Sequence, residues 1–200
     1  VPAKGLCVSV PDGEMLSIAF SNKTSMLAVG PAEFKIEAFI QGSAENSPDD
    51  NLDRESAPSN ISLSLKNGRF LFSLAQRLGS SKFTVKFPNA ESEIQSGIAI
   101  AETGTNGSRL IPLDGFARIK PQDSIWEIVK DGVSAVVPAK ESDKKIIFKH
   151  VYSRERERFG NFIKTAEQLR RSVIFKYSPN AGFAAELILP KAFFAMPIKH

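Results

Sequence analysis

Residues 61–75, ISLSLKNGRFLFSLA, carry the strongest structural signal in this sequence. The central Asn67-Gly68 is a dipeptide that type I′ hairpin turns favour, because both central residues of such a turn have a positive φ angle. Counting outward from the turn places three apolar pairs on one face and serines on the other: Leu65 with Phe70, Leu63 with Phe72, and Ile61 with Leu74. We therefore predict a β-hairpin here with one apolar face.

Similar turn signals recur along the chain. They lie between further alternating segments, at Pro11-Asp12-Gly13, Asn106-Gly107, Asp114-Gly115 and Asp131-Gly132. Short strands at a spacing of about 8–12 residues, with turn dipeptides between them, are typical of antiparallel sandwiches and barrels. The sequence predicts a mainly β fold, an antiparallel β-sandwich or jelly-roll-like domain of about ten to twelve strands.

The β pattern is interrupted once, by a helical stripe. The apolar residues Phe162, Ile163, Ala166 and Leu169 recur at the spacing of one helix face, which predicts a short amphipathic helix at about 161–171. The preceding SRERER, residues 153–158, is compatible with either a helix or a strand. Two further strands are expected in VIFKYSP and FAAELILP after the helix.

Length and composition favour one domain over residues 1–200. A 200-residue chain with 42% hydrophobic and 24% charged residues can bury a full core. Residues 42–60 are polar, contain two prolines and hold five acidic residues against Arg54 alone. Only 41 residues precede them, so we expect a long mobile loop inside the domain and the first site of limited proteolysis.

Side chains with catalytic or metal-binding chemistry are scarce. The chain has two histidines, His150 and His200, and one cysteine, Cys7, which lies in an apolar run where we expect a small buried side chain. The sequence contains no nucleophile elbow, zinc-protease motif, Walker loop or dinucleotide-binding motif. We assign no catalytic residue, metal or cofactor, and leave open an enzyme whose site is assembled from distant residues in a groove.

The charge is unevenly distributed. Residues 144–176 hold ten basic residues against three glutamates, a net charge of +7 in a chain whose total is +4. Such a segment can bind an anionic partner, although Arg–Glu alternation also occurs on solvated faces. The candidate contacts are Arg154, Arg156, Arg158, Lys164 and Arg171. The acidic residues of 42–60 could instead lie over this basic segment.

These observations favour a non-catalytic binding or assembly module with a protein partner or self-assembly. The chain begins with Val, so we expect a processed, exported or envelope-associated protein, although any trimmed chain begins in the same way. No stretch is apolar enough to span a bilayer as a helix. The alternatives are a structural protein of a viral or nucleoprotein assembly that contacts nucleic acid through residues 144–176, and the dispersed-site enzyme.

Overall fold

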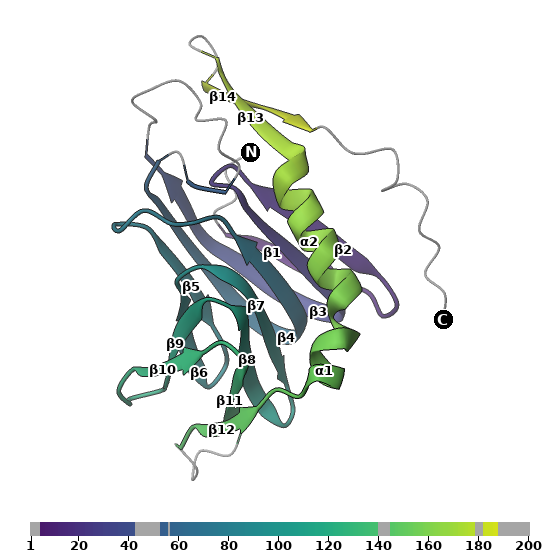
Figure 1. The fold of residues 1–200 in the computed structure, drawn as a ribbon, viewed down its shortest axis with the longest axis vertical. Helices are drawn as coiled ribbons and strands as arrows, with labels where there is room; N and C mark the ends of the chain where they lie inside the picture. The colour runs from purple at the N-terminus through teal and green to yellow at the C-terminus, as the bar shows by residue number, and fades with distance from the viewer. Residues whose placement is uncertain (1–4, 43–52, 56, 140–144, 179–181, 188–200) are drawn as a thin grey trace.

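A computed structural model of the chain describes residues 5–42, 53–55, 57–139, 145–178 and 182–187. Most described residues lie in one curled sheet of twelve strands, with two short helices on one of its faces (Figure 1). The elements are β1 (Leu6–Val10), β2 (Met15–Phe20), β3 (Thr24–Gln41), β4 (Ser59–Leu74), β5 (Lys82–Lys86), β6 (Ala90–Ile94), β7 (Gly97–Gly104), β8 (Gly107–Asp114), β9 (Phe116–Pro121), β10 (Glu127–Lys130), β11 (Val133–Pro138), β12 (Ile147–His150), α1 (Ser153–Arg158), α2 (Gly160–Ser172), β13 (Val173–Ser178) and β14 (Gly182–Leu187).

The predicted hairpin at Asn67-Gly68 is wrong, because the chain continues through this dipeptide, with a local bend, as the single strand β4. The whole strand pairs with β3, and the register between them shifts between Val29 and Glu33, opposite Gly68. Gly68 has a φ of 110°, and a Cβ atom there would lie 2.4 Å from the Cβ of Ala32. The glycine is therefore used for an irregularity inside a long strand and not for a turn.

The apolar face of this segment is nevertheless as predicted. Six side chains of β4 lie in the main core: Ile61, Leu63, Leu65, Phe70, Phe72 and Leu74. The first three are odd-numbered and the last three even-numbered, so the irregularity at Gly68 shifts the alternation by one residue. A hairpin and a phase-shifted continuous strand give the same apolar pattern, and only the pairing partners differ.

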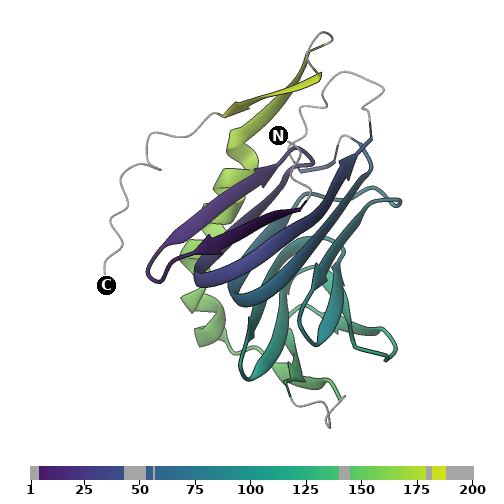
Figure 2. The ribbon, with the colours of Figure 1, turned by 180° about the vertical axis from the view of Figure 1, so that it is seen from behind.

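The break between β1 and β2, the register shift in β3 and the irregularity at Gly68 in β4 lie side by side across the sheet. We call this place the bend, and it divides the sheet into two halves. β1 and β2 follow one another along the same edge of β3, and Gly30 approaches the break between them so closely that a Cβ atom would overlap the carbonyl oxygen of Pro11. Beyond this level β4 changes its other neighbour from β5 to β7. Nine of the twelve strands follow the order β10-β9-β6-β5-β4-β7-β8-β11-β12. The strand β3 pairs with β4 outside this order and also carries β1 and β2, the purple strands in the view from behind in Figure 2.

Both halves contribute to one core. The rings of Phe34 and Phe70 meet edge to face with centroids 5.6 Å apart, and those of Phe72 and Phe83 do so at 5.2 Å. Each pair joins one half of the sheet to the other, because Phe34 and Phe83 lie before the bend and Phe70 and Phe72 beyond it. The curl of the sheet thus encloses the apolar side chains that the alternation had placed on one face.

The other turn signals have mixed outcomes. The hairpin at Asn106-Gly107 is confirmed, since β7 and β8 pair there and Gly104 lies opposite Gly107. The chain also turns at the other three signals, but the two strands that flank each of these turns do not pair with each other. β8 pairs with β7 and β11 while β9 pairs with β6 and β10, and β1 and β2 both pair with β3. These three segments are not hairpins.

The mainly β class is confirmed, and so is the helix, which extends over Gly160–Ser172. The sheet is mixed and not purely antiparallel, because β4 and β5 run parallel. The sandwich detail of the prediction is not confirmed, since hydrogen bonding joins all twelve strands into one sheet. The SRERER segment is a helix, and the two strands expected after α2 form the antiparallel pair β13–β14.

A second, smaller core lies between α2 and the sheet. Ala166 and Leu169 are buried there against Leu27 of β3 and Leu71 of β4. The hydroxyl of Ser25 donates a hydrogen bond of 2.7 Å to the backbone oxygen of Ala166. The second half of β4 is therefore covered on both faces, which the sequence analysis did not expect.

Cys7 is exposed, which corrects the expectation of a buried side chain, because β1 lies at the edge of the sheet. Residues 43–52 and 56 of the predicted loop lie outside the described residues. The last part of this predicted loop, which we call the acidic connection, is held to the sheet by Glu55. Glu55 is 3% exposed and accepts hydrogen bonds from the side chains of Asn22 and Ser59 and from the backbone N–H of Leu78. The loop also ends earlier than predicted, since β4 begins at Ser59.

Candidate functional site

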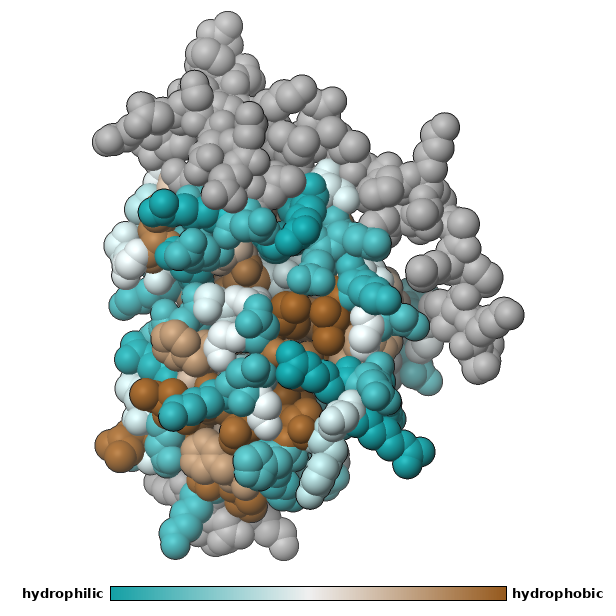
Figure 3. Space-filling model, in the orientation of Figure 1, coloured by the Kyte–Doolittle hydropathy of each residue, from teal (hydrophilic) through white to brown (hydrophobic). Residues whose placement is uncertain are grey.

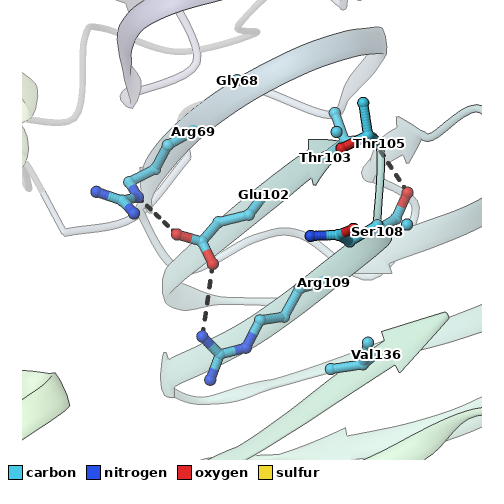
Figure 4. Close-up of a pocket in the computed structure, with 11 residues that line it drawn as sticks. Gly68, Arg69, Glu102, Thr103, Thr105, Ser108, Arg109 and Val136 are labelled. Carbon is cyan, nitrogen blue, oxygen red and sulfur yellow. Dashed lines mark hydrogen bonds and ion pairs between the residues drawn. The ribbon is translucent and has the colours of Figure 1, made fainter. Parts of the chain in front are cut away.

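A chain of ion pairs across three strands positions α1 on the sheet. Arg69 of β4 donates to Glu102 of β7 at 2.6 Å, and Glu102 lies 3.5 Å from Arg109 of β8 (Figure 4). Arg109 in turn donates to Glu155 of α1 at 2.5 Å. The four side chains alternate in charge, so the chain of pairs is neutral as a whole. It borders an open hollow of about 450 Å³ that is lined mainly by polar residues.

The Arg109–Glu155 pair is the electrostatic link between helix and sheet. The hydrogen bond from Arg109 is the largest influence on Glu155 and holds the pKa of this carboxyl below its ordinary value. Burial lowers the pKa of Arg109, but the hydrogen bond and negative charge of Glu155 outweigh it, so the pKa is raised overall. Both shifts favour the charged forms, and the pair stays ionised near neutral pH.

Two further contacts hold the same helix. The guanidinium of Arg69 lies 5.4 Å from the centroid of the Phe159 ring, which is buried immediately after α1. Arg156 donates to the backbone oxygen of Leu113 and lies 3.7 Å from Asp131. The short helix is thus fixed by side chains at both ends, and Arg156 faces the sheet.

The structure divides the five predicted basic residues into two groups. Arg156 and Arg171 have acidic partners, Asp131 and Asp53. Arg154, Arg158 and Lys164 are exposed and make no ion pair within the described part of the chain. Arg154 and Arg158 are four residues apart and therefore share one face of α1. Lys164 lies on the longer helix α2.

One contact joins the acidic connection to the basic segment, as the sequence analysis allowed. Asp53 lies 2.8 Å from Arg170 and 3.4 Å from Arg171 near the end of α2. The hydrogen bond from Arg170 is the main cause that lowers the pKa of Asp53. The end of α2 is therefore already neutralised in part, which leaves α1 as the stronger candidate surface.

The strand β12 was not predicted to belong to a site, and it precedes α1 directly in the chain. All four of its residues are exposed, and Ile147 and Phe148 are 44% and 43% exposed. Ile147 lies in register with Val136, Arg109 and Glu102, so Ile147 and Lys149 project on the sheet face where α1 lies. The sequence IFKH of residues 147–150 gives no sign of a binding surface by itself. It becomes a candidate because the structure places this exposed strand at the end of the sheet.

We call this region the β12–α1 surface. It consists of Ile147, Phe148, Lys149, Tyr152, Arg154 and Arg158. Tyr152 is 76% exposed and lines a shallow hollow of about 530 Å³ together with the two arginines and Glu155. The lower part of Figure 3, where Figure 1 places β12 and α1, shows apolar and hydrophilic patches side by side. Exposed apolar and aromatic side chains, together with cations that make no ion pair within the described residues, suit an acidic protein segment.

Two observations on the described residues concern metal binding and acid–base groups. No cluster of three or more His, Cys, Asp or Glu side chains there could hold a metal ion. The carboxyls of Glu37, Asp53 and Glu155 have lowered pKa values, each because of a hydrogen bond from a basic side chain. His150 is exposed at the end of β12. No helix among the described elements is long and apolar enough to cross a membrane.

Comparison with known proteins gives a likeness of fold. No protein-family model and no curated protein matches the sequence. Two crystal structures of a "putative anti-sigma factor" from Parabacteroides distasonis ATCC 8503, at 2.50 and 1.65 Å resolution, are similar, each with a TM-score of 0.56. Their sequences are 12% and 10% identical to this chain, and the similarity covers 77% and 76% of it. In each case it covers 63% of the neighbour, so the chain is similar to less than two thirds of these proteins' length.

Proposed function

We propose that this protein is a non-catalytic binding module that binds an acidic segment of a partner protein through the β12–α1 surface. The observation that carries the proposal is the exposure of Arg154 and Arg158 on α1, the helix that follows the exposed edge strand β12 in the chain. Both are exposed and without an ion pair in the described residues, whereas Arg156 on the opposite side of α1 is held by Asp131. The paired residues fix the helix, and the unpaired ones are available for a partner.

A protein partner has more support than nucleic acid. The structural neighbours are described as anti-sigma factors, a name for proteins that act on another protein. The β12–α1 surface also mixes apolar and basic side chains, as protein interfaces do. Neither the structure nor the comparisons support a nucleic-acid partner. An exported or envelope-associated location remains a prediction from the sequence.

The test is a binding measurement with a defined probe. A labelled extended peptide of about ten residues, in which Glu alternates with Val, is titrated against the full chain by fluorescence anisotropy. The variant Lys149→Gln/Arg154→Gln/Arg158→Gln should bind it at least about tenfold more weakly, because each exposed pair contributes up to about 1 kcal/mol and 1.4 kcal/mol is tenfold. Raising the salt concentration should weaken the wild-type complex in the same direction.

A matched variant controls for net charge. Lys35→Gln/Lys82→Gln/Lys130→Gln removes three exposed cations from other strands of the sheet and should leave the affinity within about twofold. Equal losses in the two triple variants would show that only net charge matters and would overturn the proposal. Binding of a single-stranded oligonucleotide but not of the peptide would replace the proposal with the nucleoprotein alternative.

A further inference from the structure

The strand β12 lies at one end of the sheet, and no other strand of the described residues pairs with its outer edge. Its neighbour on one side is β11, where Val133 lies opposite His150 and Ala135 opposite Phe148. The backbone N–H of Val151 donates to the oxygen of Gly132 at 2.9 Å, which makes 151 and 132 a hydrogen-bonded pair. Because such pairs alternate along an antiparallel ladder, the backbone groups of Phe148 and His150 point away from β11.

These outward groups have no backbone partner within the described residues. Apart from the bonds between β11 and β12, the described residues contain one backbone hydrogen bond near β12, from Val151 to Gly132, and it lies on the β11 side. An edge strand that presents unpaired N–H and C=O groups is a template for one more strand. Extended peptides bind many proteins in this way, with affinity from the main chain and specificity from alternate side chains.

From this geometry we infer that the acidic partner segment adds to β12 as a further strand of the sheet, which rests on the proposed function. The main chain of the segment would pair with the outward groups of Phe148 and His150. Its alternate acidic side chains would lie on the face that carries Lys149 and α1. The apolar residues of the segment would lie on the other face, where the ring of Phe148 would cover them.

A second copy of this chain fits the same edge poorly. A symmetric antiparallel pair must place residues of the same face opposite each other, so its centre lies at Phe148 or at Lys149. A centre at Lys149 sets two lysines directly opposite, and a centre at Phe148 places the lysines of both copies as diagonal neighbours on one face. Like charges across a strand pair are destabilising, so an acidic segment is the better occupant.

Backbone chemistry separates this mode of binding from simple charge attraction. The variant Phe148→Pro removes one outward N–H and leaves the bonds of Ile147 and Lys149 to β11, while Phe148→Ala keeps the N–H and removes the ring. We expect Phe148→Pro to weaken peptide binding at least about tenfold and Phe148→Ala by less than about fivefold. Addition of the peptide should also slow hydrogen exchange at the amides of Phe148 and His150 in the wild-type chain.

A modified peptide tests the same point without changing the protein. N-methylation of every second residue should abolish binding when the methyl groups face β12, and should have little effect when the other set of residues is methylated. Equal binding of the two methylated peptides and of the unmodified one, together with loss of binding in Lys149→Gln/Arg154→Gln/Arg158→Gln, would overturn strand addition while the proposed function stands. Unchanged peptide binding in that triple variant would overturn the proposed function itself.

Discussion

The two halves of β4 have the same apolar alternation but different surroundings. Before Gly68, Ile61, Leu63 and Leu65 face the core, while Ser62 and Ser64 on the opposite face are only half-buried. After Gly68, the core-facing residues alternate with Leu71 and Ser73, which are 2% exposed beneath α2. The first half belongs to a one-sided sheet and the second to a layer covered on both faces.

This difference shows what the helix adds. The sequence shows this difference only in part: Ser62 and Ser64 lie on the second face before Gly68, whereas Leu71 lies there together with Ser73 after it. The sheet strands that lie under α2 become buried on their second face because Ala166 and Leu169 pack there. Substitutions on the second face should therefore be costly in one half and inexpensive in the other.

Phe72→Ala should have the largest effect on stability. Its ring is fully buried and meets Phe83 across the bend, so the truncation leaves a cavity in the shared core. We expect a loss of about 3–5 kcal/mol in the free energy of unfolding, measured by urea denaturation. A loss below about 1 kcal/mol would mean that the two halves do not share this core.

The variants Leu71→Ala and Ser64→Ala compare the two halves of β4 on the face that points away from the main core. Leu71 is buried under α2, and its truncation should cost about 2–4 kcal/mol, whereas Ser64→Ala should change stability by less than about 0.5 kcal/mol. The same denaturation experiment gives both values. Similar costs at the two positions would contradict the distinction between a one-sided and a two-sided half.

Glu155→Gln should have a moderate effect that depends on pH. The pKa of Glu155 is lower in the folded chain than its ordinary value of 4.5, so the pair with Arg109 stabilises the fold fully above that value. Its contribution is lost as the pH falls through the lower folded pKa. At neutral pH the variant should lose about 1 kcal/mol, and the difference in melting temperature should vanish in acid. A difference that persists in acid would assign the loss to packing.

Asp53→Asn should have the smallest effect. Asp53 is 64% exposed, so its ion pairs with Arg170 and Arg171 are screened by solvent. We expect the free energy of unfolding to change by less than about 0.5 kcal/mol, measured at low and high salt. The buried Glu55 fixes the end of the connection independently of Asp53. A large loss in Asp53→Asn would show that the end of α2 depends on this contact.

The local features of the fold were predictable from the sequence. The alternation in 61–75 identified the core-facing residues, and the spacing of Ala166 and Leu169 identified the helix and its buried side. The chain turns at each glycine-containing signal, although at Asn67-Gly68 the change is a phase shift within a strand. Each of these features depends on neighbours within a few residues, where backbone preference and periodicity act.

Strand partners and the candidate site were not predictable in the same way. Among the five predicted basic residues, the sequence could not separate Arg156, held by Asp131, from Arg154 and Arg158, because the partner lies on a distant segment. It also could not show that residues 147–150 form the edge of the sheet, since edge and central strands differ in their neighbours and not in their own pattern.

The sequence alone determined the alternation of the strands, the position of the irregularity at Asn67-Gly68 and the core-facing side chains of residues 61–75. The tertiary structure decided whether Asn67-Gly68 ended a strand or shifted its phase, and which strands met across each bend. The physical reason is that a hairpin and a bent continuous strand bury the same alternating side chains. Their difference lies in the hydrogen-bond partners, and the close approach of Ala32 to Gly68 belongs to the bent strand that this protein forms.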